Sequence, residues 1–203
     1  MSVLAADDPK AVVAAREALE RGLPVGLPTE TVYVVAVDPF SAGASDRLFR
    51  LLHRRRDRDL TLLVANSDQV TAFTTALTPA ARRLMERCWP GPLTLVLPVD
   101  PESRADLGDD DLTVGVRMTA HPATAALCRE FGPLGVATAT LGDVSLVTAD
   151  ALASALGDAV PVVVDAGPCR GPSSTVIDAT GEEPHLIREG ALPWSEATAA
   201  MGG

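Results

Sequence analysis

Two hydroxyls and a carboxylate stand next to one another at Thr29, Glu30 and Thr31, directly after a short apolar stretch. Residues 25–27 read Val-Gly-Leu and predict a buried strand, which Pro28 ends because proline has no amide hydrogen for the ladder. Ligands of α/β sheets usually bind at strand ends, so this turn is a candidate ligand site. The alternative is a Ser/Thr turn whose hydroxyls only satisfy neighbouring backbone amides. These residues by themselves support both interpretations.

A second candidate is the segment 47–58, which holds six arginines among twelve residues. Guanidinium groups bind phosphate through paired hydrogen bonds, so the segment predicts an anion site. The alternative is a solvated helix face followed by a charged turn. The whole chain carries a net charge of −10, which repels nucleic acid over long range. Any RNA contact is therefore expected to be local, weak and sensitive to salt.

Several self-contained catalytic motifs are absent from the sequence. Neither GxGxxG nor GxxxxGK followed by Ser or Thr occurs, which argues against a Rossmann dinucleotide site and a Walker phosphate loop. The three cysteines and three histidines show no metal-ligand spacing, so we interpret them as structural and predict no metal site. A bound phosphate would have to be held by arginines and hydroxyls.

Apolar periodicity and turn residues alternate between helix and strand along the whole chain. A helix opened by Asp8 and Pro9 is expected to end at Gly22, and Thr78 is expected to cap a helix at 79–88. The other expected helices are 46–53, 67–76, 122–131 and 150–156. Further strands are expected at 32–37, 59–64, 94–98, 113–117, 135–139, 160–165, 174–178 and 185–188. This alternation predicts an α/β fold with a twisted mixed sheet and flanking helices.

The length and composition suit one domain over residues 1–203, because 47% of the residues are hydrophobic and can bury a sizeable core. The first residues lack the charged and apolar regions of a signal peptide, and no apolar run reaches membrane-spanning length. Cysteines without CxxC spacing suit a reducing compartment. The expected location is the cytoplasm, without membrane contact.

Five motifs resemble those of YrdC-like threonylcarbamoyl-AMP synthases and occur in that family's order. They are PTETVY at 28–33, WPGPLT at 89–94, VGVR at 114–117 with His121 and Pro122, STVID at 174–178, and IREGA at 187–191. The first two are specific signals, whereas STV or RxGA alone would be weak. The resemblance spans nearly the whole chain. It implies a single YrdC-like domain with a concave ligand face, where PTETVY, Arg117 and the STV strand converge.

Enzymes of this family begin the N6-threonylcarbamoyladenosine modification of tRNA. The resemblance therefore implies that L-threonine and bicarbonate form a carbamate, which attacks ATP to give threonylcarbamoyl-AMP and pyrophosphate. This reaction needs a positioned carbamate, a triphosphate neutralised by Mg²⁺ and cationic side chains, and exclusion of water. The family relation also implies partner proteins of tRNA modification.

The resemblance assigns roles to individual positions of this chain. The amino acid and carbamate would be bound by Thr29, Thr31, Tyr33 and Arg117. The nucleotide would be bound by Arg58, Thr138, Thr140, Ser174 and Arg188. The catalytic cation, which is a lysine in the family, would be supplied by Arg54 or Arg56, two guanidinium groups in place of a compact ammonium.

The register of the family's KxR motif stays open between two alignments. Without gaps the motif falls on Leu52, His53 and Arg54, with Arg58 at a further lysine position, and the catalytic lysine is replaced by leucine. A two-residue deletion would place Arg54 and Arg56 on the motif and retain both charges.

The chain also differs from the family pattern at Val34, where the family has glycine, and in the segment 138–143, where TATLGD corresponds to SANxSG. The last change brings the carboxylate of Asp143 toward a nucleotide site. These departures support a second hypothesis. The chain would be a divergent paralogue that keeps the fold and cavity but binds a nucleotide, a small acid or RNA without adenylation.

Overall fold

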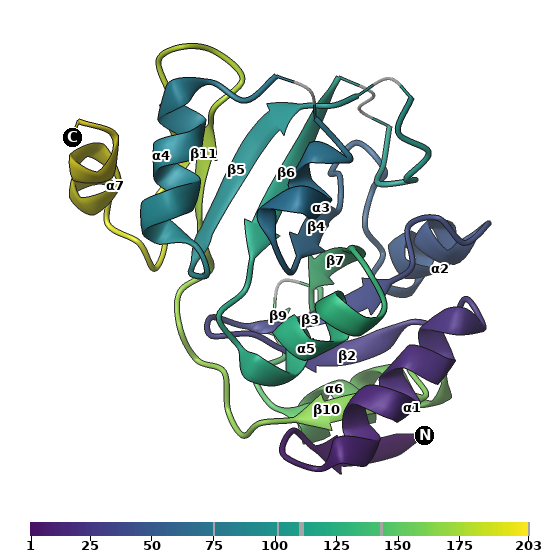
Figure 1. Ribbon diagram of the computed structural model, residues 1–203. Helices are drawn as coiled ribbons and strands as arrows, with labels where there is room; N and C mark the ends of the chain where they lie inside the picture. Colours follow the sequence, from purple (N-terminus) through teal and green to yellow (C-terminus); the bar gives the residue numbers. More distant parts are fainter. Residues whose placement is uncertain (75, 101, 110–111, 143, 203) are drawn as a thin grey trace.

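The computed structural model describes residues 1–74, 76–100, 102–109, 112–142 and 144–202. The strands are β1 (Ser2–Ala5), β2 (Val25–Pro28), β3 (Tyr33–Val37), β4 (Thr61–Val64), β5 (Leu93–Pro98), β6 (Thr113–Met118), β7 (Leu134–Thr138), β8 (Thr140–Leu141), β9 (Val144–Ser145), β10 (Val162–Asp165), β11 (Thr175–Asp178) and β12 (His185–Arg188). Ten of them form one sheet in the order β1-β10-β2-β3-β7-β4-β6-β5-β11-β12, and β8 pairs with β9. The sheet contains parallel and antiparallel neighbours and is twisted (Figure 1), which confirms the predicted mixed α/β fold.

The helices are α1 (Pro9–Glu20), α2 (Ala44–Leu51), α3 (Ser67–Thr71), α4 (Pro79–Cys88), α5 (Pro122–Glu130), α6 (Ala149–Leu156) and α7 (Trp194–Met201). The predicted caps are confirmed, since the Asp8 carboxylate accepts from the amide of Lys10 and the Thr78 hydroxyl accepts from the amide of Ala81. The helix predicted at 67–76 already ends at Thr71. The sequence interpretation missed β1, the β8–β9 pair and α7.

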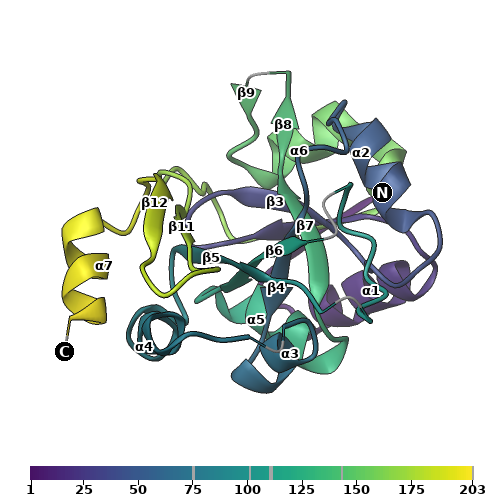
Figure 2. The same cartoon turned by 90° about the horizontal axis from the view of Figure 1, so that it is seen from above.

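Side-chain alternation along β3 divides the core between two groups of helices. Tyr33, Val35 and Val37 pack with α2 and α6, whereas Val34 and Ala36 pack with α1 and α5. Figure 2 shows these two helix pairs on opposite sides of the sheet. Successive side chains of β3, beginning with Tyr33 of PTETVY, therefore lie in different parts of the core.

The same alternation opens a site on β4, β5 and β6. Leu95 and Val116 are fully buried with Leu84 of α4, while Thr94 and Arg117 point to the other face. Burial against α4 thus fixes which residues of these strands remain to line a cavity.

The C-terminal part of the described chain returns to the middle of the sequence. β11 runs parallel to β5, with Thr175 opposite Leu93, and β12 pairs with β11 in the antiparallel direction. α7 then lies beside α4 in both views (Figures 1 and 2), and Arg83 Nε donates to the carbonyl of Met201 at 2.7 Å. This return places Ser174 and Arg188 next to the strands that carry Thr94 and Arg117.

Candidate active site

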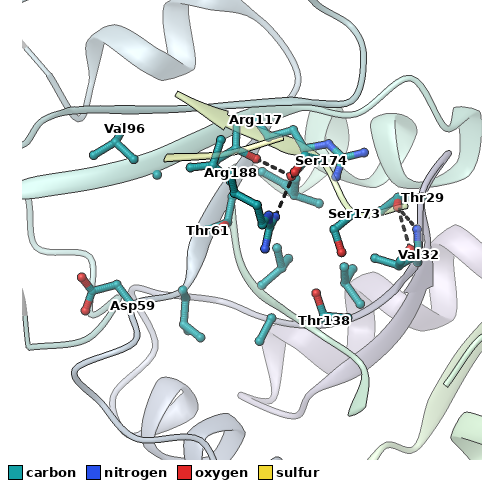
Figure 3. A pocket seen from close by; sticks show the side chains of 18 of the residues that line it. Thr29, Val32, Asp59, Thr61, Val96, Arg117, Thr138, Ser173, Ser174 and Arg188 are labelled. Atoms are coloured by element: carbon teal, nitrogen blue, oxygen red, sulfur yellow. Dashed lines mark hydrogen bonds between the residues drawn. The ribbon is translucent and has the colours of Figure 1, made fainter. Parts of the chain in front are cut away.

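A cavity of about 290 Å³ opens on the sheet face that α4 leaves free. Figure 3 shows side chains from distant parts of the chain pointing into it. Six residues predicted from the sequence line this cavity: Thr29, Arg54, Arg117, Thr138, Ser174 and Arg188. Val32 of the PTETVY stretch and Val34 just after it add apolar surface to its wall.

One wall is the TETV turn, which comprises residues 29–32. The Thr29 hydroxyl donates to the carbonyl of Val32 at 2.6 Å and accepts from the amides of Val32 and Thr31 at 3.0 and 3.2 Å. It also lies 2.9 Å from the hydroxyl of Thr31. The turn alternative considered for this stretch is therefore present in the structure, and Thr29 lines the cavity at the same time.

Arg117 joins this turn to β6. Its Nη2 donates to the Thr31 hydroxyl at 3.0 Å and forms an ion pair with the Glu30 carboxylate at 2.8 Å. The Arg117 side chain is 6% exposed, and its buried Nε has no hydrogen-bond partner among the described residues. A buried donor without a partner has an unfavourable free energy, and Arg117 also lines the cavity.

The Glu30 carboxylate is held from both sides. Its second oxygen accepts from the Thr119 hydroxyl at 2.6 Å. Burial alone would raise the pKa of Glu30, but the Arg117 guanidinium and the Thr119 hydrogen bond outweigh it, so the pKa lies below the ordinary value of 4.5. The carboxylate therefore stays charged and fixes the guanidinium of Arg117 against the turn.

The segment 52–60, here named the arginine loop, sends its arginines in different directions. Arg54 lines the cavity, and its Nε and Nη2 donate to the carbonyls of Arg58 and Asp59 at 2.5 and 2.9 Å. Burial and the nearby charge of Arg58 lower the pKa of Arg54. Arg56 instead points outward to carboxylates and does not line the cavity.

This placement corrects the prediction that Arg56 could supply the catalytic cation. Its guanidinium is bound by Asp46, Asp106 and Asp109 and points away from the cavity. The positions that face cavities are those of the alignment without gaps, in which Arg54 falls on the arginine of the KxR motif.

A second cavity of about 340 Å³ adjoins the first and shares Arg54, Ala137 and Thr138 with it. Arg58 and Thr140, both predicted to bind the nucleotide, line this cavity. Within the described part of the chain, the Arg58 side chain forms no hydrogen bond or ion pair, and it is exposed to solvent. The two cavities together therefore bring Arg54, Arg58 and two threonine hydroxyls next to the TETV turn.

Ser174 and Arg188 form the wall contributed by β11 and β12 (Figure 3). The Ser174 hydroxyl lies 2.9 Å from the Thr94 hydroxyl, and Arg188 Nη2 donates to the Ser174 carbonyl at 2.9 Å. Arg188 is otherwise exposed, so the rest of its fork is available to an anion.

Tyr33, in contrast, does not reach either cavity, which corrects its predicted place in the substrate pocket. Its ring is fully buried on the α2 and α6 side, and its hydroxyl donates to the carbonyl of Gly167 at 2.9 Å. The cause is strand alternation, which turns Val34 toward the cavity and Tyr33 away from it.

The departures from the family pattern have different outcomes. Val34 does place its side chain on the cavity wall, where it is 5% exposed. Leu52 is buried against α2 and borders the second cavity. Asp143 lies outside the described residues.

Sequence reasoning missed the Glu30–Arg117 pair and the role of Thr94 as a partner of Ser174. Glu30 was visible as the one carboxylate inside PTETVY. Thr94 was visible as the polar residue between Leu93 and Leu95, because alternation sends it to the face opposite these leucines.

The described residues contain no cluster of three or more His, Cys, Asp or Glu side chains that could hold a metal ion. In the same part of the chain, no helix has both the length and the apolar character needed to cross a membrane.

Comparison with known proteins places the chain in a family. The Sua5/YciO/YrdC family model, described as "Telomere recombination", matches residues 17–190. A threonylcarbamoyl-AMP synthase from Thiobacillus denitrificans is 37% identical over 167 residues, which cover 81% of this chain and 89% of the relative. A threonylcarbamoyl-AMP synthase from Shigella flexneri is 36% identical over 185 residues, which cover 89% and 96% of the two chains.

Solved structures agree with this relation. Sua5 from Pyrococcus abyssi in complex with L-threonine is 30% identical, with a TM-score of 0.88 over 100% of this chain and 61% of that chain. This chain therefore spans less than two thirds of the length of that Sua5. YciO from Escherichia coli has a TM-score of 0.84 at 23% identity, over 94% and 95% of the two chains, and so shows the same fold. The chain belongs to the Sua5/YciO/YrdC family.

Proposed function

We propose that this chain condenses L-threonine, bicarbonate and ATP to threonylcarbamoyl-AMP and pyrophosphate, for N6-threonylcarbamoyladenosine in tRNA. Its family membership and its relatives named threonylcarbamoyl-AMP synthases support this reaction. The observation that carries the proposal is the meeting of the TETV turn, Arg117, Ser174 and Arg188 around one cavity.

The amino acid would bind at the end of the cavity formed by the TETV turn. Thr29 offers a hydroxyl there, and Val32 and Val34 offer methyl groups, which suits a small side chain carrying both a hydroxyl and a methyl group. The unpartnered Nε of Arg117 would donate to the carboxylate or the carbamate. Bicarbonate adds to the threonine amine with loss of water, which produces that carbamate.

The nucleotide would lie across the two adjoining cavities. Arg54 and Arg58, with the hydroxyls of Thr138 and Thr140, would hold the triphosphate, while Ser174 and Arg188 would contact the α-phosphate. A carbamate oxygen then attacks the α-phosphorus as the bond to the leaving pyrophosphate breaks. Fixed donors around the transferring group stabilise the charge that develops there.

Mg²⁺ would accompany the triphosphate. Asp59 lines the first cavity and provides a carboxylate, and Mg²⁺ commonly binds through one or two carboxylates together with substrate phosphates. Since the described residues hold no larger acidic cluster, the phosphate oxygens of ATP would supply most of the other ligands of the ion.

We also propose a cytoplasmic location and a limited contact with RNA. The three cysteines are free thiols, which fits a reducing compartment. The net charge of −10 restricts RNA binding to the exposed arginines of the arginine loop. Delivery of the unstable product to tRNA would then depend on other proteins of the modification system.

The test of this proposal is pyrophosphate release by the purified protein with ATP, bicarbonate and Mg²⁺. We expect release that requires L-threonine and is accompanied by a threonylcarbamoyl-AMP product in mass spectrometry. Omission of bicarbonate and replacement of L-threonine by D-threonine are the controls. Binding of ATP by calorimetry without any threonine-dependent release would replace the enzyme by a nucleotide-binding paralogue.

A further inference from the structure

The guanidinium of Arg56 is surrounded by acceptors on every side. Nη1 contacts the Asp46 carboxylate at 2.6 Å, Nη2 contacts Asp106 at 2.6 Å, and Nε contacts Asp109 at 2.9 Å. Nη2 also donates to the carbonyl of Gly108 at 3.1 Å. We name this arrangement the Arg56 hub. Four of the five N–H groups of the guanidinium therefore donate to acceptors of the protein itself.

The hub joins three separate segments of the chain. Asp46 belongs to α2, Arg56 to the arginine loop, and Asp106 and Asp109 to the described segment 102–109. The guanidinium also lies 4.9 Å from the ring centroid of Phe49 on α2, within the range of a cation–π contact.

Backbone contacts repeat the same connection. The amide of Asp109 donates to the carbonyl of Arg56 at 3.1 Å, and the amide of Leu60 donates to the carbonyl of Leu107 at 2.6 Å. Residues 102–109 therefore cross the arginine loop, and we name them the strap. The ion pairs of the hub connect the strap to the loop in addition to these backbone hydrogen bonds.

The arginine loop also carries the residues that face the two cavities. Arg54 and Arg56 are separated by one residue and point in different directions, Arg54 into the cavities and Arg56 into the hub. Arg54 contacts the loop backbone at the carbonyls of Arg58 and Asp59. The outer contacts of Arg56 thus oppose any movement that would withdraw Arg54 and Arg58 from the cavities.

The charges of the hub predict that replacement of Arg56 is unfavourable. Three carboxylates face one guanidinium, so removal of Arg56 leaves three negative charges close together. A lysine ammonium carries its charge at one point and lacks the planar fork that reaches the three carboxylates from three nitrogens.

We propose that Arg56 is a positioning residue, which holds the arginine loop under its strap so that Arg54 and Arg58 face the anion of the substrate. This role rests on the proposed function where ATP is the anion, but the ordering of the loop can be measured without turnover. Arg56 would thus have a role in substrate binding although it does not line the cavity.

The experiment compares the full chain with Arg56→Gln, Arg56→Lys and, as a milder variant, Asp109→Asn. Arg16→Gln is the control, because it breaks an exposed ion pair with Glu20 that lies on α1, outside the hub. Hydrogen exchange of the amides of Leu60 and Asp109 reports loop order. Calorimetry with ATP and with pyrophosphate reports anion binding, and steady-state kinetics separate KM for ATP from kcat.

We expect exchange at these two amides to accelerate by on the order of tenfold in Arg56→Gln and Arg56→Lys, with a smaller change in Asp109→Asn. We also expect KM for ATP, or the Kd for ATP and pyrophosphate, to rise by on the order of tenfold while kcat changes less. Arg56→Gln combined with Asp106→Asn should recover part of the loss, because one of the repelling carboxylates becomes neutral.

Two results would overturn the inference. The first is unchanged exchange at Leu60 and Asp109 in both Arg56 variants. The second is faster exchange without any change in KM or Kd, which would make the hub a stability device alone. If the wild-type chain lacks threonine-dependent turnover but binds pyrophosphate, the proposed function fails while the exchange and binding measurements still decide the role of Arg56.

Discussion

The Glu30–Arg117 ion pair connects the residue chemistry of PTETVY to the shape of the cavity. Side-chain exposure is 6% for Arg117 and 22% for Glu30, so the guanidinium is withdrawn from water while the carboxylate keeps partial contact with it. A buried pair of this kind adds little net stability, but either partner alone is costly. We therefore interpret the ion pair as a contact that fixes the position of the Arg117 guanidinium.

Arg117→Ala should destabilise the protein by about 1–3 kcal/mol, because the partly exposed carboxylate of Glu30 loses its hydrogen-bonded countercharge. The measurement is the midpoint and slope of urea unfolding. Arg16→Ala is the matched control, since its ion pair with Glu20 has side-chain exposures of 44% and 52% and should contribute at most about 0.5 kcal/mol. Equal effects of the two substitutions would contradict the buried-pair interpretation.

The same pair predicts a pH dependence of stability. The folded pKa of Glu30 is lower than its ordinary value of 4.5, so the unfolded chain takes up the proton first as the pH falls. The contribution of Glu30 is complete above that value and is lost as the pH falls toward the folded pKa. Glu30→Gln should therefore lose less of its melting temperature than the wild type between neutral pH and about pH 3. Parallel melting curves for the two proteins would count against it.

Arg188 is exposed at the cavity and contacts the protein through the Ser174 carbonyl. Arg188→Ala should lower turnover by a hundred- to a thousandfold, or about 2.7–4 kcal/mol, if it holds the transferring phosphoryl group. Arg82→Ala, an exposed position on α4, should leave turnover unchanged. Full activity in Arg188→Ala would remove this residue from the proposed site.

At the scale of elements, β11 and β12 depend on one glycine. A Cβ added at Gly190 would overlap the carbonyl oxygens of Ser173 and Ser174, so the chain carrying the cavity wall approaches this position too closely for a side chain. Gly190 also donates its amide to the Thr175 hydroxyl at 2.9 Å. The IREGA motif therefore contains a packing requirement as well as an arginine.

Gly190→Ala should destabilise the fold by about 1–3 kcal/mol and displace Ser174 and Arg188 together. Thermal unfolding and ATP binding by calorimetry would measure the two effects. Gly181→Ala is the control from the turn between the same strands, because a Cβ there meets nothing within 4 Å. If Gly190→Ala binds ATP as the wild type does, the close approach has no consequence for the site.

Elements with strong local signals could be predicted from the sequence. The caps at Asp8 and Thr78 are local hydrogen bonds between near neighbours, and they fixed α1 and α4 closely. β1 was missed because it is short, exposed and stabilised by pairing with β10 far along the chain. α7 was missed because its apolar face of small residues is defined mainly by packing beside α4.

At the scale of the molecule, the net charge of −10 and the arginine loop act in opposite directions. RNA binding should be weak and should fall steeply with salt, with a slope of log K of roughly −0.7 for each neutralised phosphate of a single strand. Fluorescence anisotropy with tRNA over a salt series measures this slope. Arg55→Ala with Arg58→Ala should flatten it, because both side chains are exposed. Tight binding that persists at high salt would contradict the prediction.

As with the fold, only some residues of the candidate site could be predicted from the sequence. Thr29, Arg117, Ser174 and Arg188 could be found from motifs, since the motifs mark strand segments whose side chains meet on one face of the sheet. The directions of Arg54, Arg56 and Tyr33 could not, because they depend on long-range partners such as Asp106 and Gly167. Residue type identified the candidates, and tertiary contacts decided which of them face the cavity.

The return of β11 beside β5 also determines when the cavity wall can form during folding. The cavity needs both the TETV turn and Arg188, so a chain synthesised only as far as β10 lacks part of the wall. Contacts between such distant residues form late in folding, because a large loop must close before they add stability. An anion would thus meet the full set of cavity side chains only after β11 and β12 have joined the sheet.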